Sequence, residues 1–367
     1  MKMQKFETTV IIVGAGPSGL ATSACLNLEN IPNIVLEKED CSASLWKKRA
    51  YDRLKLHLAK QFCELPHFPF PPNATTYVPK HVFIQYLDDY ASHFNVSPLY
   101  HRNVVAATFD GGDKWRVVAE NTLFGATEEY LAKFLVVATG ENNEGFIPKV
   151  LGMETFSGEI LHSSSYENGK KYEKKNVLVV GSGNSGMEIA YDLSNWDSHA
   201  SIVIRSPVHF LTLGMVKFGM VLLKYLPEAP VDNYGIERPS QGPFFLKRTI
   251  GRAPVIDVGT IAKIQAREIE VLPSIKKVEG EYIHFKNGDA KPYDAIIFAT
   301  GYKSVVKKWL KDDGELFNDD GMPKKRCPNH WKGENGLYCV GFARAGLFGI
   351  SRDAKAIAHD IKAILSN

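Results

Sequence analysis

The sequence has few cysteines, and none is placed to pair with another. Its 367 residues include five cysteines, and no two of them form a CxxC or CxxxxC pattern. An odd number of widely spaced cysteines argues against a disulfide framework and against a zinc site, and we predict no other metal site. Unpaired cysteines also favour a reducing compartment, so we expect the protein in the cytoplasm.

The sequence also lacks a segment that is long and apolar enough to cross a membrane. The first ten residues have no signal-peptide core, and no uncharged apolar run reaches the length of about 18 residues that a spanning helix needs. Residues 208–226 come closest, but they include His209, Lys217 and Lys224. We expect a buried or amphipathic helix there. Peripheral contact with a membrane, such as the cytosolic face of the endoplasmic reticulum, stays open.

Charge of one sign is not in excess either. The chain has 44 Lys and Arg against 41 Asp and Glu, spread along its length, which gives a formal net charge of +3. Nothing in this balance indicates nucleic acid as a partner. The apolar share of 44% and the charged share of 23% exclude a disordered or coiled-coil chain. The length suits two domains, and no pattern in the sequence indicates the oligomeric state.

The chain contains the same arrangement twice. Residues 8–13 and residues 176–180 are short apolar runs, and each is followed by a GxGxxG motif, a predicted helix and a second predicted strand. The two motifs are Gly14, Ala15, Gly16, Pro17, Ser18 and Gly19, and then Gly181, Ser182, Gly183, Asn184, Ser185 and Gly186. Strand, GxGxxG, helix and strand make up half of a doubly wound fold. The sequence therefore predicts an α/β protein with two dinucleotide-binding, Rossmann-like domains.

Each half closes in the same way, and the end of the chain returns to the first half. A hairpin-like stretch and an apolar strand ending in Ala-Thr-Gly close each half. The chain then continues with a strand over residues 337–342, a turn at Gly346 and Gly349, and a helix over residues 352–365. This last segment has no glycine motif, so we expect it to complete the first domain. Residues 66–79, with five prolines, are predicted to be a loop of that domain.

The residue that ends the second strand of each half distinguishes the two sites. Glu37 follows Gly14 by 23 residues, and a carboxylate there accepts hydrogen bonds from both ribose hydroxyls of FAD or NAD. Arg205 follows Gly181 by 24 residues and suits the 2′-phosphate of NADP, with Ser206 as a second donor. Alternatively, Arg205 is a solvated surface cation. We expect FAD in a domain of residues 1–150 and 301–367, with an NADPH domain, residues 151–300, inserted into it.

A protein that binds both a flavin and NADPH can belong to three classes of enzyme. A disulfide reductase needs a cysteine pair near the flavin, which this chain lacks, whereas a reductase with a protein partner and a monooxygenase both stay open. Residues 156–166 read FxGxxxHxxxY, with His162 at the histidine position, just before the second glycine motif. This stretch resembles the fingerprint of flavin-containing and Baeyer–Villiger monooxygenases, and it favours the third class.

The resemblance narrows to the plant YUCCA flavin monooxygenases, and within them to the short, divergent members. It runs nearly end to end and is carried by residues 46–58 (WKKRAYDRLKLHL), 60–66 (KQFCELP), 241–243 (QGP), 253–260 (APVIDVGT) and 298–302 (FATGY). What it implies is auxin biosynthesis: oxidative decarboxylation of indole-3-pyruvate, a 2-keto acid, to indole-3-acetate with NADPH and dioxygen. Glu167, Ala59 and Ala345 replace residues common in the family, and a helical insert after Asp232 is missing.

The resemblance and the motifs together give a set of site residues. His57, Lys60 and Asn184 are the catalytic candidates, and Lys60 is expected to anchor the substrate carboxylate. Phe62 and Phe68 either cover an indole ring or belong to the core. Besides the two glycine motifs, the residues expected to contact the cofactors are Glu37, Lys38, Trp46, His57, Ala138, Thr139, Gly140, His162, Arg205, Ser206, Thr300 and Gly301. Two rival functions stay open: a monooxygenase that oxidises nitrogen or sulfur atoms, and an inactive flavin-binding relative.

Overall fold

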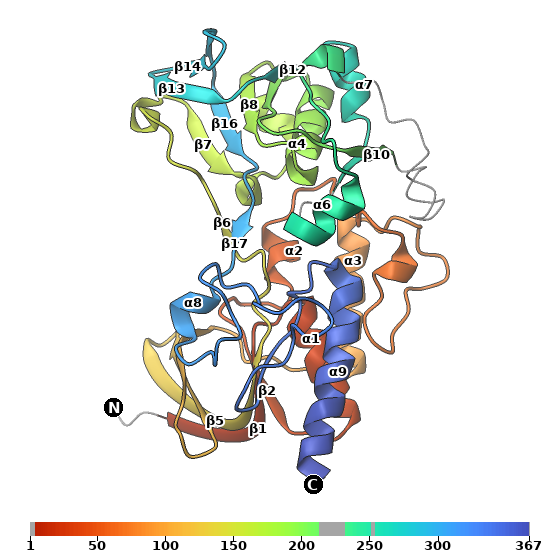
Figure 1. Cartoon of the computed structure of the whole chain (residues 1–367), viewed down its shortest axis with the longest axis vertical. Coiled ribbons are helices and arrows are strands. Elements are labelled where there is room, and N and C mark those ends of the chain that lie inside the picture. The colour runs from red at the N-terminus through yellow and green to blue at the C-terminus, as the bar shows by residue number, and fades with distance from the viewer. Residues whose placement is uncertain (1–3, 213–231, 251–253, 367) are drawn as a thin grey trace. The chain divides into compact units, whose positions relative to one another are not determined.

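The chain folds into two compact units. The structure, a computed structural model, describes residues 4–212, 232–250 and 254–366 (Figure 1). The first unit comprises Met1–Lys48, Leu58–Glu144 and Tyr302–Asn367, and the second comprises Arg49–His57 and Gly145–Gly301. The second unit thus begins at Gly145 rather than near residue 151. It also includes Arg49–His57, a stretch that lies within residues 1–150, the first part of the predicted FAD domain.

The first unit is built on a six-stranded mixed sheet. In order across the sheet its strands are β2 (Asn33–Leu36), β1 (Gln4–Val13), β5 (Ala126–Val137), β4 (Trp115–Asn121) and β3 (Arg102–Phe109), with β18 (Leu337–Cys339) also paired with β5. Strands β1, β2, β5 and β18 run parallel, and the β3–β4–β5 segment is antiparallel. The last four residues of β1 are buried, as expected for a central parallel strand.

Helices of the first unit pack beside this sheet and against one another. Figure 1 shows α9 (Gly346–Ser366) alongside α1 (Pro17–Leu28), so the C-terminal segment does return to the first unit. The predicted turn at Gly346 and Gly349 is wrong, because α9 begins at Gly346. Gly349 belongs to the first turn of that helix, where a side chain would press on Ala343 and Ala345. The other helices of the unit are α2 (Ser44–Lys48), α3 (Lys80–His93) and α8 (Val306–Trp309).

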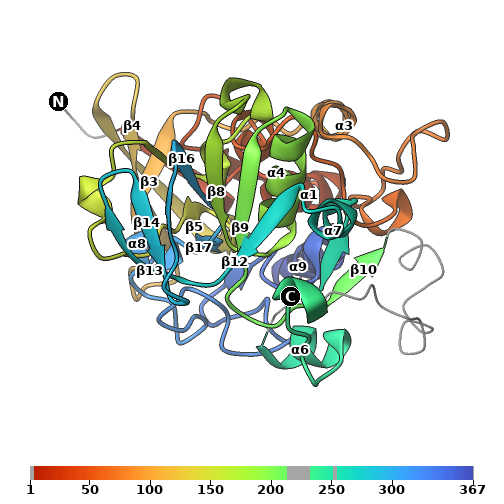
Figure 2. The ribbon, with the colours of Figure 1, turned by 90° about the horizontal axis from the view of Figure 1, so that it is seen from above.

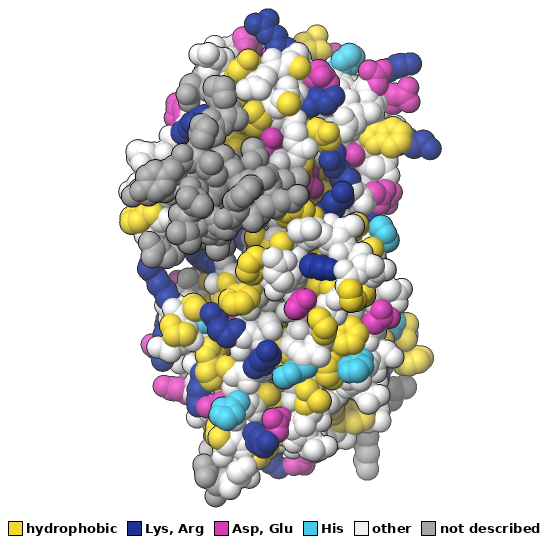
Figure 3. All heavy atoms as spheres, turned by 90° about the vertical axis from the view of Figure 1, so that its right-hand side faces the viewer, with side chains coloured by type: hydrophobic (Ala, Val, Ile, Leu, Met, Phe, Trp, Pro, Cys, Tyr) yellow, Lys and Arg dark blue, Asp and Glu magenta, His cyan; other side chains and the backbone are white. Residues whose placement is uncertain are grey.

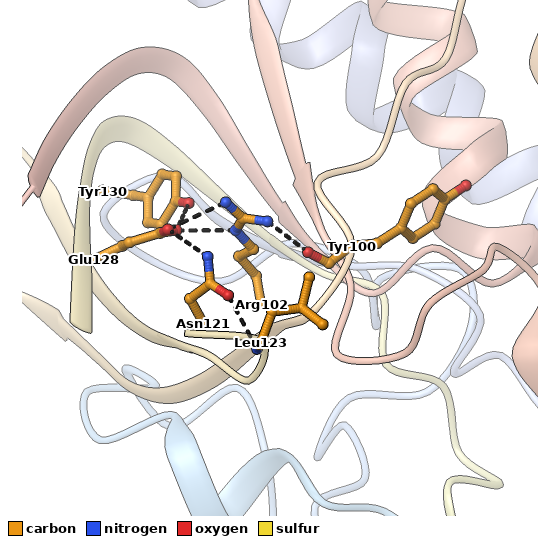
Figure 4. A network of polar contacts seen from close by, with 6 residues as sticks. All are labelled: Tyr100, Arg102, Asn121, Leu123, Glu128 and Tyr130. Atoms are coloured by element: carbon orange, nitrogen blue, oxygen red, sulfur yellow. Dashed lines mark hydrogen bonds and ion pairs between the residues drawn. The ribbon is translucent and has the colours of Figure 1, made fainter. Parts of the chain in front are cut away.

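A buried carboxylate fixes the antiparallel part of this sheet. Glu128 accepts hydrogen bonds from the guanidinium of Arg102 at 3.0 and 3.1 Å and from the amide of Asn121 at 3.0 Å, and the Tyr130 hydroxyl donates to it as well (Figure 4). A carboxylate that is only 4% exposed needs such partners, since burial without them costs several kcal/mol. The network therefore ties β3, β4 and β5 together.

The second unit contains a five-stranded, fully parallel sheet (Figure 2). In order its strands are β12 (Ile269–Leu272), β9 (His199–Val203), β8 (Asn176–Val180), β16 (Ala295–Phe298) and β7 (Glu159–His162). Helix α4 (Asn184–Asn195) connects β8 to β9, and α7 (Thr260–Gln265) precedes β12. This is the predicted strand, glycine motif, helix and strand order, so the doubly wound pattern is confirmed in both units.

Smaller elements complete the second unit. The Asn287-Gly288 pair lies between β14 (Tyr282–Phe285) and β15 (Ala290–Pro292), which pair as the predicted hairpin, and β13 (Ile275–Glu279) adds a third strand. The unit also contains β10 (Phe210–Thr212) paired with β11 (Val255–Asp257), and α6 (Pro243–Ile250). The short strands β6 (Glu144–Gly145) and β17 (Tyr302–Lys303) pair where the chain passes from one unit to the other.

The helix expected over residues 208–226 falls mostly outside the described residues. Its described beginning is strand β10, so no helix begins at residue 208. Within the part of the chain that the structure describes, no helix is long and apolar enough to cross a membrane. Residues 66–79 form the predicted loop, which consists of turns and irregular backbone. On the face drawn in Figure 3, cations, carboxylates and hydrophobic side chains are interspersed, in keeping with the small net charge.

Candidate functional site

The glycine motif of the first unit forms an open cradle at the start of α1. Gly14 has φ +108°, and a side chain there would lie 2.7 Å from the carbonyl oxygen of Ala138. A side chain on Gly19 would collide with the Gly14 carbonyl, whereas a Cβ atom added to Gly16 would have no other atom within 4 Å. The first and third glycines are therefore required by backbone contacts, and the second leaves room for a pyrophosphate at the helix N-terminus.

The second motif repeats this geometry around α4. Gly181 has φ +116° and would place a side chain 2.5 Å from the carbonyl oxygen of Ala299. A side chain on Gly186 would collide with the Gly181 carbonyl, whereas a Cβ atom added to Gly183 would have no other atom within 4 Å. Each first glycine thus approaches the Ala-Thr-Gly segment of its own unit, Ala138 or Ala299. The residues present fit one dinucleotide pyrophosphate in each unit.

The threonine and glycine of each Ala-Thr-Gly segment follow the alanine that the glycine motif approaches. The Thr139 hydroxyl is buried without a hydrogen-bond partner, and the Thr300 hydroxyl donates to the carbonyl of Phe146. Gly140 and Gly301 both have positive φ angles, +76° and +84°. These glycines therefore turn the chain sharply just beyond each central strand.

Glu37 is held beside the first glycine turn. Its carboxylate accepts a hydrogen bond from the Ala15 amide at 2.7 Å and another from the Glu39 amide at 3.0 Å, and the residue is only 7% exposed. A carboxylate fixed at the end of β2 is placed to accept from ribose hydroxyls. The Lys38 ammonium lies 3.5 Å from the Asn143 side-chain oxygen, and Trp46 packs edge-on against a neighbouring ring of α3.

The structure corrects the alignment of Glu37 with Arg205. In the first unit Val13 is opposite Leu36, and in the second Val180 is opposite Val203. Both units have the same spacing up to that point, so the counterpart of Glu37 is Ile204 and the counterpart of Lys38 is Arg205. The second site therefore lacks the acidic residue altogether, with a buried isoleucine in its place.

Arg205 stays available for an anion. It is exposed, and the structure gives its guanidinium no hydrogen bond or ion pair with any described residue. Ser206, the next residue, is half-buried. An unpaired guanidinium one residue beyond an apolar strand end suits a 2′-phosphate better than free ribose hydroxyls.

The fingerprint histidine is fixed as a neutral ring. His162 Nε2 donates to the Gly301 carbonyl at 3.0 Å, and its Nδ1 accepts from the Ser164 amide at 3.1 Å. Burial lowers the pKa of His162 below its usual value of 6.5. The ring also occupies the space that a side chain on Gly145 would need. His162 thus contacts the first and last residues of the Gly145–Gly301 segment.

The fingerprint tyrosine and glycine also have defined contacts. The Tyr166 hydroxyl donates to Asp192 at 2.7 Å, and the Gly169 amide donates to the same carboxylate oxygen at 2.9 Å. A side chain on Gly158 would collide with the carbonyl of Asp294. The fingerprint is therefore attached to helix α4 at its tyrosine end.

Two of the three catalytic candidates are engaged in holding the fold. The Lys60 ammonium donates to the carbonyls of Pro71, Pro72 and Ala74 at 3.2, 3.0 and 2.8 Å, which uses all three of its hydrogens. Lys60 therefore fastens the proline-rich loop, and the prediction that it anchors a substrate carboxylate has no support in its contacts. Asn184 accepts from the Ile256 amide at 2.8 Å and so holds β11.

The aromatic candidates divide in the same way. Phe62 is 50% exposed, whereas Phe68 packs among the rings of Tyr86, Tyr90 and Phe94. Phe68 is thus part of an aromatic cluster of the first unit. Of these two residues, Phe62 is the one with a large part of its surface exposed.

His57, the third candidate, bonds within the second unit. Its Nε2 lies 2.6 Å from Glu188 Oε1 on α4, and the Glu188 side chain is 4% exposed. Neither Glu188 nor Asp192 is among the site residues predicted from the sequence. The available signal was a pair of acidic residues on the face of a helix that should be buried behind a glycine motif.

Comparisons with known proteins agree with this geometry. Residues 11–210, more than half of the chain, match the family described as pyridine nucleotide-disulphide oxidoreductase. The chain belongs to this family, although its five cysteines are all free in the structure. Among solved structures, a flavin-containing monooxygenase from Stenotrophomonas maltophilia aligns with a TM-score of 0.77 and 20% identity, covering 98% of this chain and 99% of that one. That likeness shows the fold.

Curated relatives from Arabidopsis thaliana are much closer in sequence. The probable indole-3-pyruvate monooxygenase YUCCA10 is 53% identical over 98% of this chain and 98% of its own length. The indole-3-pyruvate monooxygenase YUCCA6 is 45% identical over 96% of this chain and 90% of its own length. Together with two dinucleotide cradles and a complete fingerprint, these matches show that the chain belongs to the YUCCA family of flavin-dependent monooxygenases.

Proposed function

We propose that this chain converts indole-3-pyruvate, NADPH, a proton and dioxygen to indole-3-acetate, carbon dioxide, NADP⁺ and water. The observation that carries the proposal is its 53% identity, over nearly the full length of both chains, to a relative named as a probable indole-3-pyruvate monooxygenase. One oxygen atom of dioxygen enters the acid and the other leaves as water, so two electrons from NADPH balance the reaction.

The first unit holds FAD in this proposal. The amides around Gly16 and the N-terminus of α1 face the pyrophosphate, and Glu37 accepts from the ribose hydroxyls. FAD supplies the redox chemistry when it is bound: it takes electrons from NADPH and passes them to dioxygen. The chain's own side chains then need only bind, orient and exclude water.

The second unit holds NADPH. The amides around Gly183 and the start of α4 face its pyrophosphate, and Arg205 with Ser206 faces the 2′-phosphate. Ile204 offers no acceptor to a free ribose, which supports NADPH over NADH. His162 keeps its proton on Nε2, where the Gly301 carbonyl accepts it, and so stays uncharged beside the end of the sheet.

Product analysis tests the reaction directly. The FAD-loaded protein is incubated with indole-3-pyruvate, NADPH and ¹⁸O-labelled dioxygen. One labelled oxygen in indole-3-acetate, with NADPH and keto acid consumed in equal amounts, supports the proposal. Oxidation of an added thioether with the keto acid untouched would instead assign a sulfur-oxidising activity. NADPH consumption that yields only hydrogen peroxide would leave an uncoupled oxidase.

A cytoplasmic location is part of the proposal, and fractionation tests it against attachment to the endoplasmic reticulum.

A further inference from the structure

A short segment between two parts of the first unit belongs to the second unit and packs on it. Arg49–His57, here called the strap, lies between α2 and residue 58, which both belong to the first unit. Chain connectivity therefore anchors the strap at both ends outside the unit on which it packs. The strap contains no helix or strand, only a turn, bends and a single bridge residue at Lys55, so individual side-chain and backbone contacts hold it.

Both ends of the strap are held by polar contacts. At its C-terminal end, His57 Nε2 lies 2.6 Å from Glu188 Oε1. Near its N-terminal end, the Asp52 amide donates to the Glu167 carbonyl at 2.9 Å, and the Asp52 carboxylate accepts from Asn168 at 2.8 Å. Glu167 and Asn168 directly follow the fingerprint tyrosine, so the strap touches that segment as well.

The middle of the strap packs on α4. The Arg53 guanidinium lies 4.3 Å from the centre of the Tyr191 ring and 3.8 Å from Asp192. Tyr51 is 4% exposed and belongs to the hydrophobic core of the second unit. Its hydroxyl lies close to Ser185 and Glu188, without a well-formed hydrogen bond. The strap therefore extends over α4 from its first turn to its last.

The groups that meet the strap lie on one face of α4. Ser185, Glu188 and Asp192 are separated by three and four residues, the spacing of one helix face. Glu188 and Asp192 are 3% and 8% exposed, so the helix buries two carboxylates under this segment and the fingerprint. Burying charge is costly, and here each carboxylate has a partner supplied by the strap.

We propose that Glu188 is a positioning residue that acts through His57, so that the nucleotide bound at the start of α4 and the strap order one another. This rests on the proposed NADPH site. Glu188 lies one helical turn beyond Asn184, within the same short helix whose first turn faces the pyrophosphate. A nucleotide that fixes this turn also fixes Glu188, and His57 with it.

Hydrogen exchange of the FAD-loaded protein with and without NADP⁺ tests the coupling. In the wild type, NADP⁺ should slow exchange at the glycine motif, residues 181–186, and also in the strap. In His57→Ala and in Glu188→Ala, only the glycine motif should respond. The Kd for NADP⁺ should rise about fivefold or more, because coupling is reciprocal. The variant that combines His57→Ala with Glu188→Ala should lose no more NADP⁺ affinity than either single variant.

Two further variants separate positioning from simple stability. Glu188→Gln keeps an oxygen that accepts from His57 and should restore part of the strap response. Glu270→Ala removes an ion pair with Lys291 elsewhere in the same unit and should leave the strap response intact. His57 is 30% exposed, so His57→Ala gives a folded variant even where Glu188→Ala does not.

Each negative outcome has a distinct meaning. Protection of residues 181–186 by NADP⁺ with no response of the strap in the wild type overturns the coupling and leaves the NADPH site in place. An unchanged strap response in a less stable Glu188→Ala protein makes Glu188 merely structural and also overturns it. Protection at neither segment overturns the NADPH assignment, and this proposal with it.

Discussion

The Tyr166 hydroxyl donates a 2.7 Å hydrogen bond to Asp192, which joins the last residue of the fingerprint to the last turn of α4. Both residues are buried, and Asp192 accepts the Gly169 amide through the same oxygen. The fingerprint therefore holds the chain at two points: at Tyr166 on the helix and at His162 on the Gly301 carbonyl. Helix α4 and the fingerprint are therefore joined directly by a buried hydrogen bond.

Tyr166→Phe is expected to destabilise the second unit. The variant removes a hydrogen bond to a buried carboxylate without changing the shape of the ring, and such bonds are worth about 1.5–3 kcal/mol. Urea unfolding followed by fluorescence measures the change. Tyr282→Phe is the matched control, because Tyr282 is 45% exposed, and its midpoint should not move. An unchanged midpoint for Tyr166→Phe would show that Gly169 and Arg53 already satisfy Asp192.

The middle glycines should separate the two cofactors. Nothing lies within 4 Å of a side chain built on Gly16 or on Gly183, so Gly16→Val and Gly183→Val should both fold. Gly16→Val should be purified without FAD, because the side chain fills the space of the pyrophosphate. Gly183→Val should be purified with FAD, but NADPH should no longer reduce it, as absorbance of the flavin band will show.

Gly19→Ala and Gly186→Ala provide the comparison for these variants. Each would place a methyl group against the carbonyl of the first glycine of its motif, so both should fail to fold or should unfold early. Loss of FAD from a folded Gly183→Val protein would contradict the division into two sites.

The two dinucleotide-binding folds could be predicted from the sequence because the motifs that indicate them are local. A tight turn, an open approach and a helix start need glycine at fixed spacing within six residues, and the structure shows a backbone reason for Gly14, Gly19, Gly181 and Gly186. The hairpin at Asn287-Gly288 is equally local. Such features can be predicted without knowledge of the rest of the fold.

The features that the sequence did not reveal depend on distant partners. His57 and Glu188 are 131 positions apart, and no periodicity links a polar loop to a carboxylate on a buried helix face. The role of Lys60 likewise depends on three carbonyl oxygens, which a sequence cannot orient. The match of Arg205 with Glu37 is also wrong by one residue. The strand pairing shows that Arg205 corresponds to Lys38, and this pairing cannot be read from the sequence alone.

Arg205→Ala should weaken NADPH binding far more than NADH binding. The guanidinium has no partner among the described residues, so its removal leaves no buried group unsatisfied and should not affect folding. A charge-assisted contact of about 1.5–3 kcal/mol corresponds to roughly a tenfold to hundredfold rise in the KM for NADPH. Arg267→Ala is the matched control, since Arg267 is also exposed on the second unit. Equal losses for both nucleotides would contradict the assignment of the 2′-phosphate.

His162 should make the stability of the second unit fall as the pH drops. Burial lowers the pKa of His162 in the folded state below the value of 6.5 that it has when unfolded. Between these two pKa values the unfolded chain binds more protons than the folded one, so the free energy of unfolding decreases as the pH falls through 6.5. Above that value this contribution does not change with pH. Urea unfolding at a series of pH values should show this slope in the wild type, and His162→Gln should reduce it. Gln can still donate to the Gly301 carbonyl, so a slope that persists in full in His162→Gln would assign the pH dependence to other groups.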